Sequence, residues 1–291
     1  MLKSMTGFGR AEKTIGDKTF FVELKALNGK QLDIQMKLPS MLKPFEFEIR
    51  NKLQEKLIRG TVDVFISVKQ MGVTRPVTIN TDLIRSYYLQ IKALATELEV
   101  DTQSVLGSLL RLPEVIAPGM EVMPENEFLI FMEVFEAAVN ELNQHRVQEG
   151  QSIEDDLTQL MLRIQEKEEK IILLAPKRME RIKEEIRQLL HQHVGEENYD
   201  NNRMEQELIY YMEKIDIHEE QIRLRQHADY FREIILSSDN SKGKKLSFLL
   251  QEIGREINTT GSKAYDADIQ KCVVEMKDDL EKAKEQILNV L

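Results

Sequence analysis

The chain has 291 residues, enough to bury the core of one large domain or two ordinary ones. Forty basic side chains stand against fifty acidic ones, and the formal net charge of -10 argues against non-specific nucleic-acid binding through bulk electrostatics. The single cysteine, Cys272, excludes an intramolecular disulfide. Because no segment has the apolar run of a membrane span or a signal peptide, we expect a cytoplasmic protein.

The N-terminal part of the chain has the alternating pattern of β-strands. Apolar and polar residues alternate from Thr19 to Leu27 and again from Leu32 to Leu38, which predicts two strands with one solvated face. Asn28-Gly29 between them is typical of a hairpin turn. The same alternation from Thr61 to Lys69 predicts a third strand.

Helices are expected between and after these strands. Pro44 opens a predicted helix that extends to Leu57, and a second helix is predicted from Thr81 to Leu98 with Asn80 or Thr81 as its cap. The segment Leu112–Gly119 contains residues that interrupt regular structure. We therefore place an α+β domain at residues 1–118.

From Glu125 onward the spacing of apolar residues is helical. Pro176 interrupts this pattern, so we expect a kink or break near Ala175. We expect the apolar stripes on either side of Pro176 to be buried against each other or against a neighbouring chain. We predict an all-helical region with long, coiled-coil-like helices at 119–200, serving as an oligomer contact or clamp arm, and a C-terminal helical domain at 201–291. The stripes consist of Ile153, Leu157, Leu160, Ile164, Ile171 and Leu174 and then Met179, Ile182, Ile186, Leu189 and His193, with Lys167 at an expected apolar position.

Two segments in the last part of the chain concentrate polar and charged groups. Lys214–His227 reads KIDIHEEQIRLRQH and Gln251–Lys263 reads QEIGREINTTGSK. Residues three and four apart share a helix face. The pattern predicts that Glu219, Arg223 and His227 form one line and that Asp216 and Glu220 form a second. It also predicts that Glu252 and Glu256 form a pair beside Arg255. Glu207 lies upstream on the same helical pattern as the first segment.

These faces could form a mixed acidic and basic cleft between two antiparallel helices. Carboxylates there could hold a divalent cation while arginine and lysine bind a phosphate, as phosphodiester cleavage requires. Glutamate and arginine at this spacing are more often surface ion pairs, and a lone His227 is more often a capping or packing residue. The end of the second segment could be a simple helix stop, with Gly261 as a left-handed cap. The glycine spacing of a Walker A loop is absent before Lys263, which excludes an ATPase site of that kind.

The polar motifs of this chain resemble the YicC/YloC family of bacterial endoribonucleases from end to end. Ser4–Arg10 (SMTGFGR) is similar to the opening signature of the family, although Gly29 and Lys30 depart from its usual residues. Lys244 replaces an arginine of the family, and Gly254 lies inside a predicted helix. The C-terminal matches are Arg203, Glu207, Lys214, Asp216, Ile217, Glu219, Glu220, Arg223, Leu224, His227, Gly243, Lys245, Leu246, Phe248, Gln251, Glu252, Arg255, Glu256, Asn258, Thr259, Gly261, Ser262, Lys263, Glu285, Gln286 and Asn289.

The resemblance implies an endoribonuclease that depends on a divalent cation, Mn or Mg, and cuts single-stranded RNA inside a homohexameric ring. A ring could also gather basic groups in its channel despite the acidic total charge. The implied catalytic residues are Glu252, Glu256, Glu219, Glu220 and His227, and the implied metal ligands are Glu207, Glu219, Glu220, Glu252 and Glu256. The implied RNA-binding residues are Arg10, Lys30, Arg203, Lys214, Arg223, Lys245, Arg255, Asn258 and Lys263.

Two other functions stay open. The chain could be a non-catalytic RNA-binding adaptor that presents small RNAs to another nuclease, which a metal-dependent cleavage assay distinguishes from an enzyme. It could also be a structural coiled-coil assembly factor, but helix packing alone does not need so many matched polar residues. For Ser4–Arg10, an edge strand with closely packed glycines is the structural interpretation, and a phosphate contact by Arg10 is the functional one.

Overall fold

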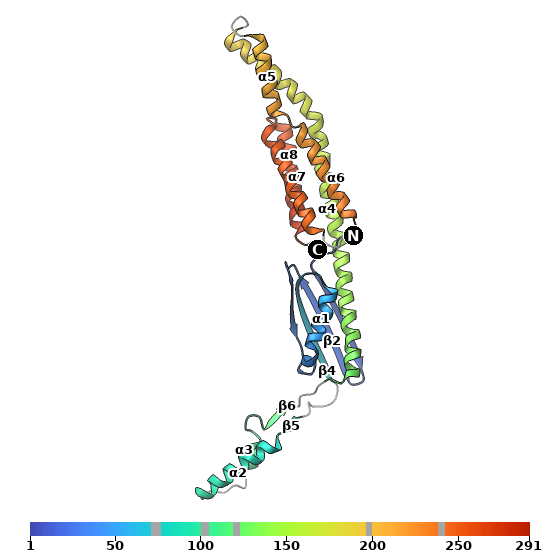
Figure 1. The fold of residues 1–291 in the computed structure, drawn as a ribbon, viewed down its shortest axis with the longest axis vertical. Helices are drawn as coiled ribbons and strands as arrows, with labels where there is room; N and C mark the ends of the chain where they lie inside the picture. The colour runs from blue at the N-terminus through green and yellow to red at the C-terminus, as the bar shows by residue number, and fades with distance from the viewer. Residues whose placement is uncertain (71–76, 100–104, 119–122, 196–199, 238–241) are drawn as a thin grey trace.

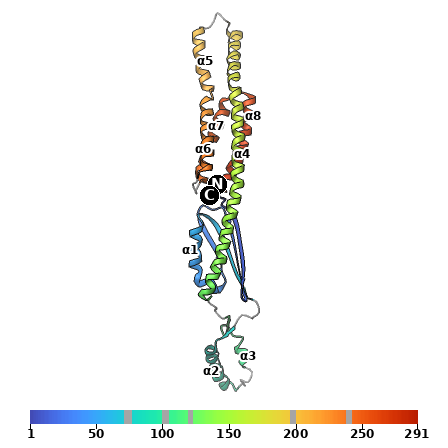
Figure 2. The same cartoon turned by 90° about the vertical axis from the view of Figure 1, so that its right-hand side faces the viewer.

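A computed structural model of the chain shows a long molecule built along one helix (Figure 1). The structure describes residues 1–70, 77–99, 105–118, 123–195, 200–237 and 242–291. Helix α4, Glu125–Val194, has 70 residues and extends past both a β-sheet and a helical bundle (Figure 2). At 1.5 Å per residue it is about 105 Å long. The predicted fold class, an N-terminal α+β part followed by a helical part with long helices, is confirmed.

Four strands form the N-terminal sheet in the order β1-β2-β4-β3. β1 and β2 are antiparallel, β2 and β4 are antiparallel, and β3 lies parallel to β4. The predicted hairpin at Asn28-Gly29 is therefore wrong, because β4 lies between the two strands that the turn would join. The Asn28 amide instead donates a hydrogen bond of 2.7 Å to the backbone carbonyl of Leu288. The strands are β1 Gly7–Ile15, β2 Lys18–Leu27, β3 Leu32–Lys37 and β4 Gly60–Gln70.

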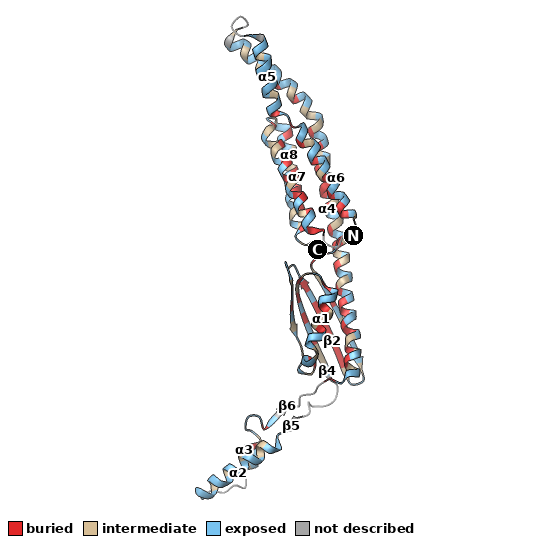
Figure 3. Ribbon diagram, in the orientation of Figure 1, coloured by how far each residue is buried: buried red, intermediate tan, exposed pale blue. Residues whose placement is uncertain are grey.

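A helical crossover joins the parallel strands β3 and β4, as parallel pairing requires. It consists of the short 3-10 helix η1, Ser40–Phe45, and helix α1, Glu46–Lys56, so the helix predicted from Pro44 is confirmed with Pro44 inside η1. Alternate residues of β2, including Phe20, Val22 and Leu24, point into a core shared with α1 and the first part of α4. Figure 3 colours the buried positions along these strands and helices red.

The edge strand β1 lies directly on α4. A Cβ atom at Gly9 would lie 2.1 Å from the backbone carbonyl oxygen of Ala138 and 2.6 Å from the backbone nitrogen of Leu142. Only glycine permits so close an approach between a strand and a helix. The structural interpretation of the segment Ser4–Arg10 therefore accounts for Gly9.

A small unit lies at the far end of the sheet from the bundle (Figure 1). Its two short strands, β5 Val77–Ile79 and β6 Ile116–Pro118, are antiparallel, and they flank helices α2 Thr81–Glu97 and α3 Val105–Leu109. The side chain of Asn80 accepts a hydrogen bond of 3.1 Å from the backbone N–H of Leu83, so the predicted cap is confirmed. Within the described residues, α2 contributes no buried side chain.

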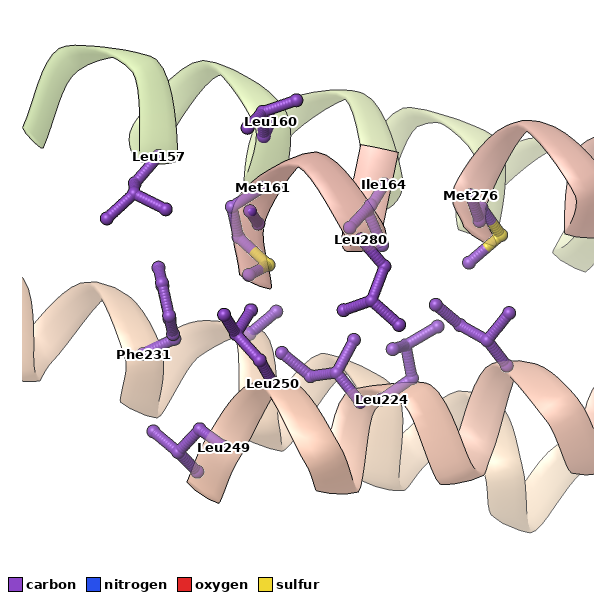
Figure 4. Close-up of a cluster of buried hydrophobic side chains, with 14 of the residues drawn as sticks. Leu157, Leu160, Met161, Ile164, Leu224, Phe231, Leu249, Leu250, Met276 and Leu280 are labelled. Carbon is purple, nitrogen blue, oxygen red and sulfur yellow. The ribbon is translucent and has the colours of Figure 1, made fainter. Parts of the chain in front are cut away.

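The C-terminal bundle packs against the second part of α4. Its helices are α5 Asn201–Ile215, α6 His218–Leu236, α7 Gly243–Lys263 and α8 Ala267–Ile287. Leu157, Leu160 and Ile164 of α4 meet Phe231, Leu250 and Leu280 in one hydrophobic core (Figure 4). No helix in the part of the chain that the structure describes has the length and apolar character needed to cross a membrane.

Of the kink or break predicted near Ala175, the break is wrong, because α4 continues as one helix through Pro176. Pro176 is exposed, so its ring lies on the solvent side of the helix. The stripes before and after it do not pack against each other, since they lie on the same continuous helix. Ile164 and Ile171 are buried by the bundle of the same chain, whereas Leu189 stays 55% exposed. Residues 195–202, GEENYDNN, have the composition of a polar turn, and residues 196–199 of this segment lie outside the described residues.

Gly261 is not the predicted left-handed cap, because α7 continues to Lys263 and Gly261 has no positive φ. A Cβ atom at Gly261 would lie 2.9 Å from Cγ1 of Val273 on α8. Gly254 approaches α8 in the same way, with Cδ2 of Leu280 at 3.0 Å. Both glycines therefore permit close packing of α7 on α8, which explains their presence inside a helix.

Gly261→Ala should destabilise the protein by about 1–2 kcal/mol even though alanine favours a helix, because buried Val273 has little room to move. Chemical denaturation measures the change. Gly107→Ala is the matched control, since a Cβ there meets nothing within 4 Å. Adding Val273→Ala to the Gly261→Ala variant should recover part of the loss, and an additive double variant would contradict the proposed contact.

Candidate active site

The two polar segments form an antiparallel pair of helices, α6 and α7 (Figure 2). Lys263 in the last turn of α7 reaches Glu220 in the first turn of α6, as the antiparallel arrangement requires. The predicted line of Asp216 and Glu220 on one helix is wrong, because α5 ends at Ile215 and α6 begins at His218. The Asp216 carboxylate instead accepts a hydrogen bond of 3.2 Å from the backbone N–H of His218.

Glu220 is buried between the two helices, with 5% of its surface exposed. Its Oε1 accepts a hydrogen bond of 2.8 Å from Nζ of Lys263. Its Oε2 is buried and has no hydrogen-bond partner among the described residues. Glu220 therefore has one oxygen held by the ammonium group of Lys263 and one buried oxygen with no protein partner among the described residues.

Glu256 of α7 is the second buried carboxylate of this cluster, with 4% of its surface exposed. Burial raises its pKa, and the charge of Glu220 raises it further, while Arg223, His227 and Arg255 act in the opposite direction. The two carboxylates therefore lie close enough for their charges to interact. We call Glu220, Glu256 and the basic groups Arg223, His227, Arg255 and Lys263 the α6–α7 cluster.

The remaining acidic candidates on these helices differ in exposure. Glu219 is exposed and forms an ion pair with Arg223 on the same face of α6. Glu252 is half-buried and lies one turn before Glu256 on α7. Both residues border the α6–α7 cluster, whereas Glu220 and Glu256 lie at its centre.

Arg178 of α4 fixes the ends of two helices at this site. It is 2% exposed, and its Nη2 donates hydrogen bonds of 2.9 Å to the backbone carbonyls of both Ile215 and Lys263. These carbonyls lie at the C-terminal ends of α5 and α7, where a cation is favourable. Arg178 therefore positions the backbone of Lys263, whose ammonium group holds Glu220.

The other predicted site residues lie outside the α6–α7 cluster. Arg203 and Glu207 lie on α5, where they line an open cavity of about 380 Å³ with apolar residues of α4. Lys245 lies in the first turn of α7, roughly 27 Å along the helix from Lys263. Lys214 and Arg10 each lie over an aromatic ring. Nζ of Lys214 is 4.3 Å from the ring centre of Tyr210, and Cζ of Arg10 is 4.7 Å from the ring centre of Phe21 on the sheet. Asn258 is exposed on α7, and Lys30 is exposed between β2 and β3.

The carboxylates fit a divalent cation only in part. Over the described ranges, no group of three or more His, Cys, Asp or Glu side chains lies together as a metal site would require. The five predicted metal ligands therefore do not form one group in a single chain. Glu220 and Glu256 can supply two ligand sites, and Mg²⁺ commonly uses one or two carboxylates together with water and substrate phosphate.

Three buried charges on the described part of α4 escaped the sequence analysis, namely Arg146, Glu168 and Arg178. Glu168 and Arg178 are each 2% exposed and continue the four-and-three spacing of the buried stripe. Lys167, which we expected at an apolar position, is half-buried and forms an ion pair with Glu275. The spacing from Ile164 to Ile171 could have identified Glu168, but a charged residue at a buried position goes against the usual pattern.

Glu168 makes the stability of the protein depend on pH. Burial raises its pKa from 4.5 to about 7, against the opposing effect of Arg225, while Asp229 and Glu169 raise it further. The folded chain thus binds this proton more tightly than the unfolded chain, so the stabilising contribution is present below about pH 4.5 and is lost as the pH rises through about 7.

Glu168→Gln should remove this dependence. As the pH rises from about 4.5 to about 7, the unfolding free energy of the variant should increase by on the order of 2 kcal/mol relative to that of the wild type. Urea denaturation at a series of pH values measures the difference. Glu169→Gln, at the exposed neighbouring position, should keep the pH dependence of the wild type. Parallel curves for Glu168→Gln and the wild type would show that Glu168 titrates normally.

The α6–α7 cluster belongs to a class of site suited to phosphate esters, with two carboxylates for a cation and basic side chains for a phosphate. Residues 2–155 match the family described as "Endoribonuclease YicC-like, N-terminal region", and residues 164–291 match "Endoribonuclease YicC-like, C-terminal". The chain belongs to the YicC-like endoribonuclease family, as its motifs predicted.

Two relatives are similar to the chain over its whole length. The probable endoribonuclease YicC of Clostridioides difficile is 31% identical over 296 residues, covering 100% of both chains. The probable endoribonuclease YicC of Haemophilus influenzae is 30% identical over 297 residues, again covering 100% of both chains.

Proposed function

We propose that this protein is a divalent-metal-dependent endoribonuclease that cuts single-stranded RNA at the α6–α7 cluster. The observation that carries the proposal is the pair of buried carboxylates, Glu220 and Glu256, held among Arg223, Arg255 and Lys263. Burying two acidic groups whose charges interact is unfavourable for folding, and such arrangements concentrate at functional sites. The endoribonuclease names of the family and of the two relatives support the reaction class.

Each group of the cluster has a defined role in this proposal. Glu220 Oε2 and Glu256 would hold the cation, which would stabilise the charge that develops on the phosphate during cleavage. Arg223 and Arg255 bind the phosphate and orient the RNA strand. Lys263 holds Glu220 in place through the hydrogen bond of 2.8 Å, and His227 can move a proton between the strand and water.

We further propose that the protein acts as a homo-oligomeric ring in the cytoplasm. Apolar side chains near the tip of the molecule support assembly, since Leu189, Ile209 and Tyr210 are all more than half exposed in the single chain. A ring can also enclose a flexible single strand, whereas the deep groove of an RNA duplex is closed to side chains.

Incubating labelled RNA with the protein and Mn²⁺ or Mg²⁺, with and without EDTA, tests the proposal. Internal cleavage of single-stranded RNA that stops with EDTA is the expected result. Equal cleavage with EDTA would contradict the metal mechanism. Tight RNA binding without any product would favour the adaptor function, and light scattering on the same sample reports the assembly.

A further inference from the structure

The N-terminal sheet has phenylalanines on the face that points away from its core. Val22 and Leu24 of β2 point into the core with α1 and α4, so the residues between and beside them point to the opposite face. Phe8 of β1, Phe21 of β2 and Phe65 of β4 lie on this opposite face, in three neighbouring strands. Phe8 is 37% exposed and Phe65 is 45% exposed, so both rings are open to a ligand.

A basic side chain lies over two of these rings. Cζ of Arg10 is 4.7 Å from the ring centre of Phe21, and Nζ of Lys25 is 5.9 Å from the ring centre of Phe8. The rings of Phe21 and Phe65 meet edge to face, with their centres 6.1 Å apart. Flat aromatic and guanidinium surfaces therefore extend across three strands. We call Phe8, Arg10, Phe21, Lys25 and Phe65 the aromatic face.

Each cation of the aromatic face is paired with a carboxylate of the same strand. Arg10 forms an ion pair with Glu12 at 3.4 Å, and Lys25 forms one with Glu23 at 2.8 Å. Because both cations are already paired, a phosphate gains little electrostatic attraction here. A ligand is therefore bound mainly by stacking on the flat rings and on the guanidinium of Arg10.

Bases of single-stranded RNA fit this face better than a protein surface does. A protein partner would have to bury the two ion pairs beside the rings, and charged residues are depleted from the centre of protein interfaces. A base covers a single ring and leaves the neighbouring charges in water. Exposed aromatic residues on a four-stranded sheet can stack roughly two or three RNA bases. The chain belongs to an endoribonuclease family, which makes RNA the expected ligand.

We infer that the aromatic face binds bases of single-stranded RNA by stacking, with little preference for sequence. This inference rests on the proposed function, because it assigns a second contact to the same substrate. Gly9 of β1 packs on α4 at Leu142, whereas the carbonyl of Lys263 is bound by Arg178 of the same helix. These two positions are roughly 54 Å apart along α4. Within one chain the aromatic face is thus far from the α6–α7 cluster, so it contributes to RNA affinity and not to the chemical step.

Binding of fluorescently labelled oligouridylate to the full-length protein in EDTA tests the inference without cleavage. Phe65→Leu should weaken binding about tenfold, because leucine keeps the apolar surface but has no flat ring. Phe65→Trp should bind at least as tightly as the wild type, since its ring can stack. Both variants should keep the salt dependence of the wild type, because no phosphate contact is lost. Phe47→Leu on α1 is the matched control, since Phe47 is 75% exposed and lies outside the aromatic face.

Three outcomes would overturn the inference. The first is equal binding by Phe65→Leu and the wild type, and the second is a loss of binding that Phe65→Trp shares. The third is a lower assembly mass of Phe65→Leu by light scattering without RNA, which would identify the face as a contact between copies of the chain.

Cleavage kinetics separate this inference from the proposed function. In Phe65→Leu the KM for RNA should rise about tenfold while kcat stays constant, whereas Glu256→Gln should slow cleavage and keep RNA binding. Cleavage by Phe65→Leu with an unchanged KM would contradict the aromatic face alone. RNA binding that depends on Phe65 in a protein that cuts no RNA supports the aromatic face and contradicts the nuclease alone.

Discussion

Glu256→Gln should lower the single-turnover rate of RNA cleavage by a hundredfold or more, which corresponds to roughly 3 kcal/mol of transition-state stabilisation. The variant removes a carboxylate that is 4% exposed and whose charge interacts with that of Glu220, so the cation would lose one of its two protein ligands. Because burial already raises the pKa of Glu256, the neutral amide should fold at least as well as the wild type. RNA affinity should stay constant or increase, since a negative charge near the phosphate is removed.

The matched control for this variant is Glu281→Gln on the exposed surface of α8, where Glu281 pairs only with Lys284 among the described residues. It makes the same chemical change outside the α6–α7 cluster and should leave the rate unchanged. Arg223→Ala should weaken RNA binding and reduce its salt dependence, as expected for a lost phosphate contact. If folded Glu256→Gln cuts RNA at the wild-type rate, Glu256 is a structural residue, and Glu252 becomes the next carboxylate to test.

Replacing Leu160 and Ile164 together with aspartate should prevent the bundle from folding. Both side chains lie in the core between α4 and the C-terminal helices, and Ile164 is fully buried (Figure 4). Burying an unpaired carboxylate in an apolar core costs several kcal/mol. Two such costs together are comparable with the unfolding free energy of a typical domain. Circular dichroism and light scattering should show lost helix content and aggregation.

Leu162→Asp is the control, because it places the same charge between these positions on the exposed side of α4. Leu162 is 43% exposed, so this variant should fold and assemble with little change. A double variant with full helix content and unchanged mass would contradict the assigned core.

Local signals in the sequence predicted local structure well. The cap at Asn80 and the alternation in β2 and β4 depend on neighbouring residues, and the structure confirms them. The two antiparallel helices considered for the polar segments are present as α6 and α7. The domain boundaries at residues 118 and 200 stay predictions, as do the roles of the site residues.

The wrong predictions concern partners that are distant in sequence. Asn28-Gly29 has the composition of a hairpin, but β4 offers β2 and β3 a better partner than they offer each other. A proline inside a helix usually kinks or breaks it. At Pro176, however, the packing of α4 along two cores outweighs the loss of one backbone hydrogen bond. The spacing of Ile164 and Ile171 marks position 168 of α4 as buried, but the partner that covers Glu168 there is α6, which is distant in sequence.

The continuity of α4 has a mechanical consequence for the whole molecule. Residues Phe128–Leu142 of this helix complete the sheet core, and residues 153–171 complete the bundle core, with Gly150 between them. A helix turns by about 100° and advances 1.5 Å with each residue. One inserted or deleted residue near Gly150 would therefore rotate the sheet by about a quarter turn relative to the bundle. The number of residues between Leu142 and Ile153 therefore determines the direction in which the sheet faces relative to the α6–α7 cluster.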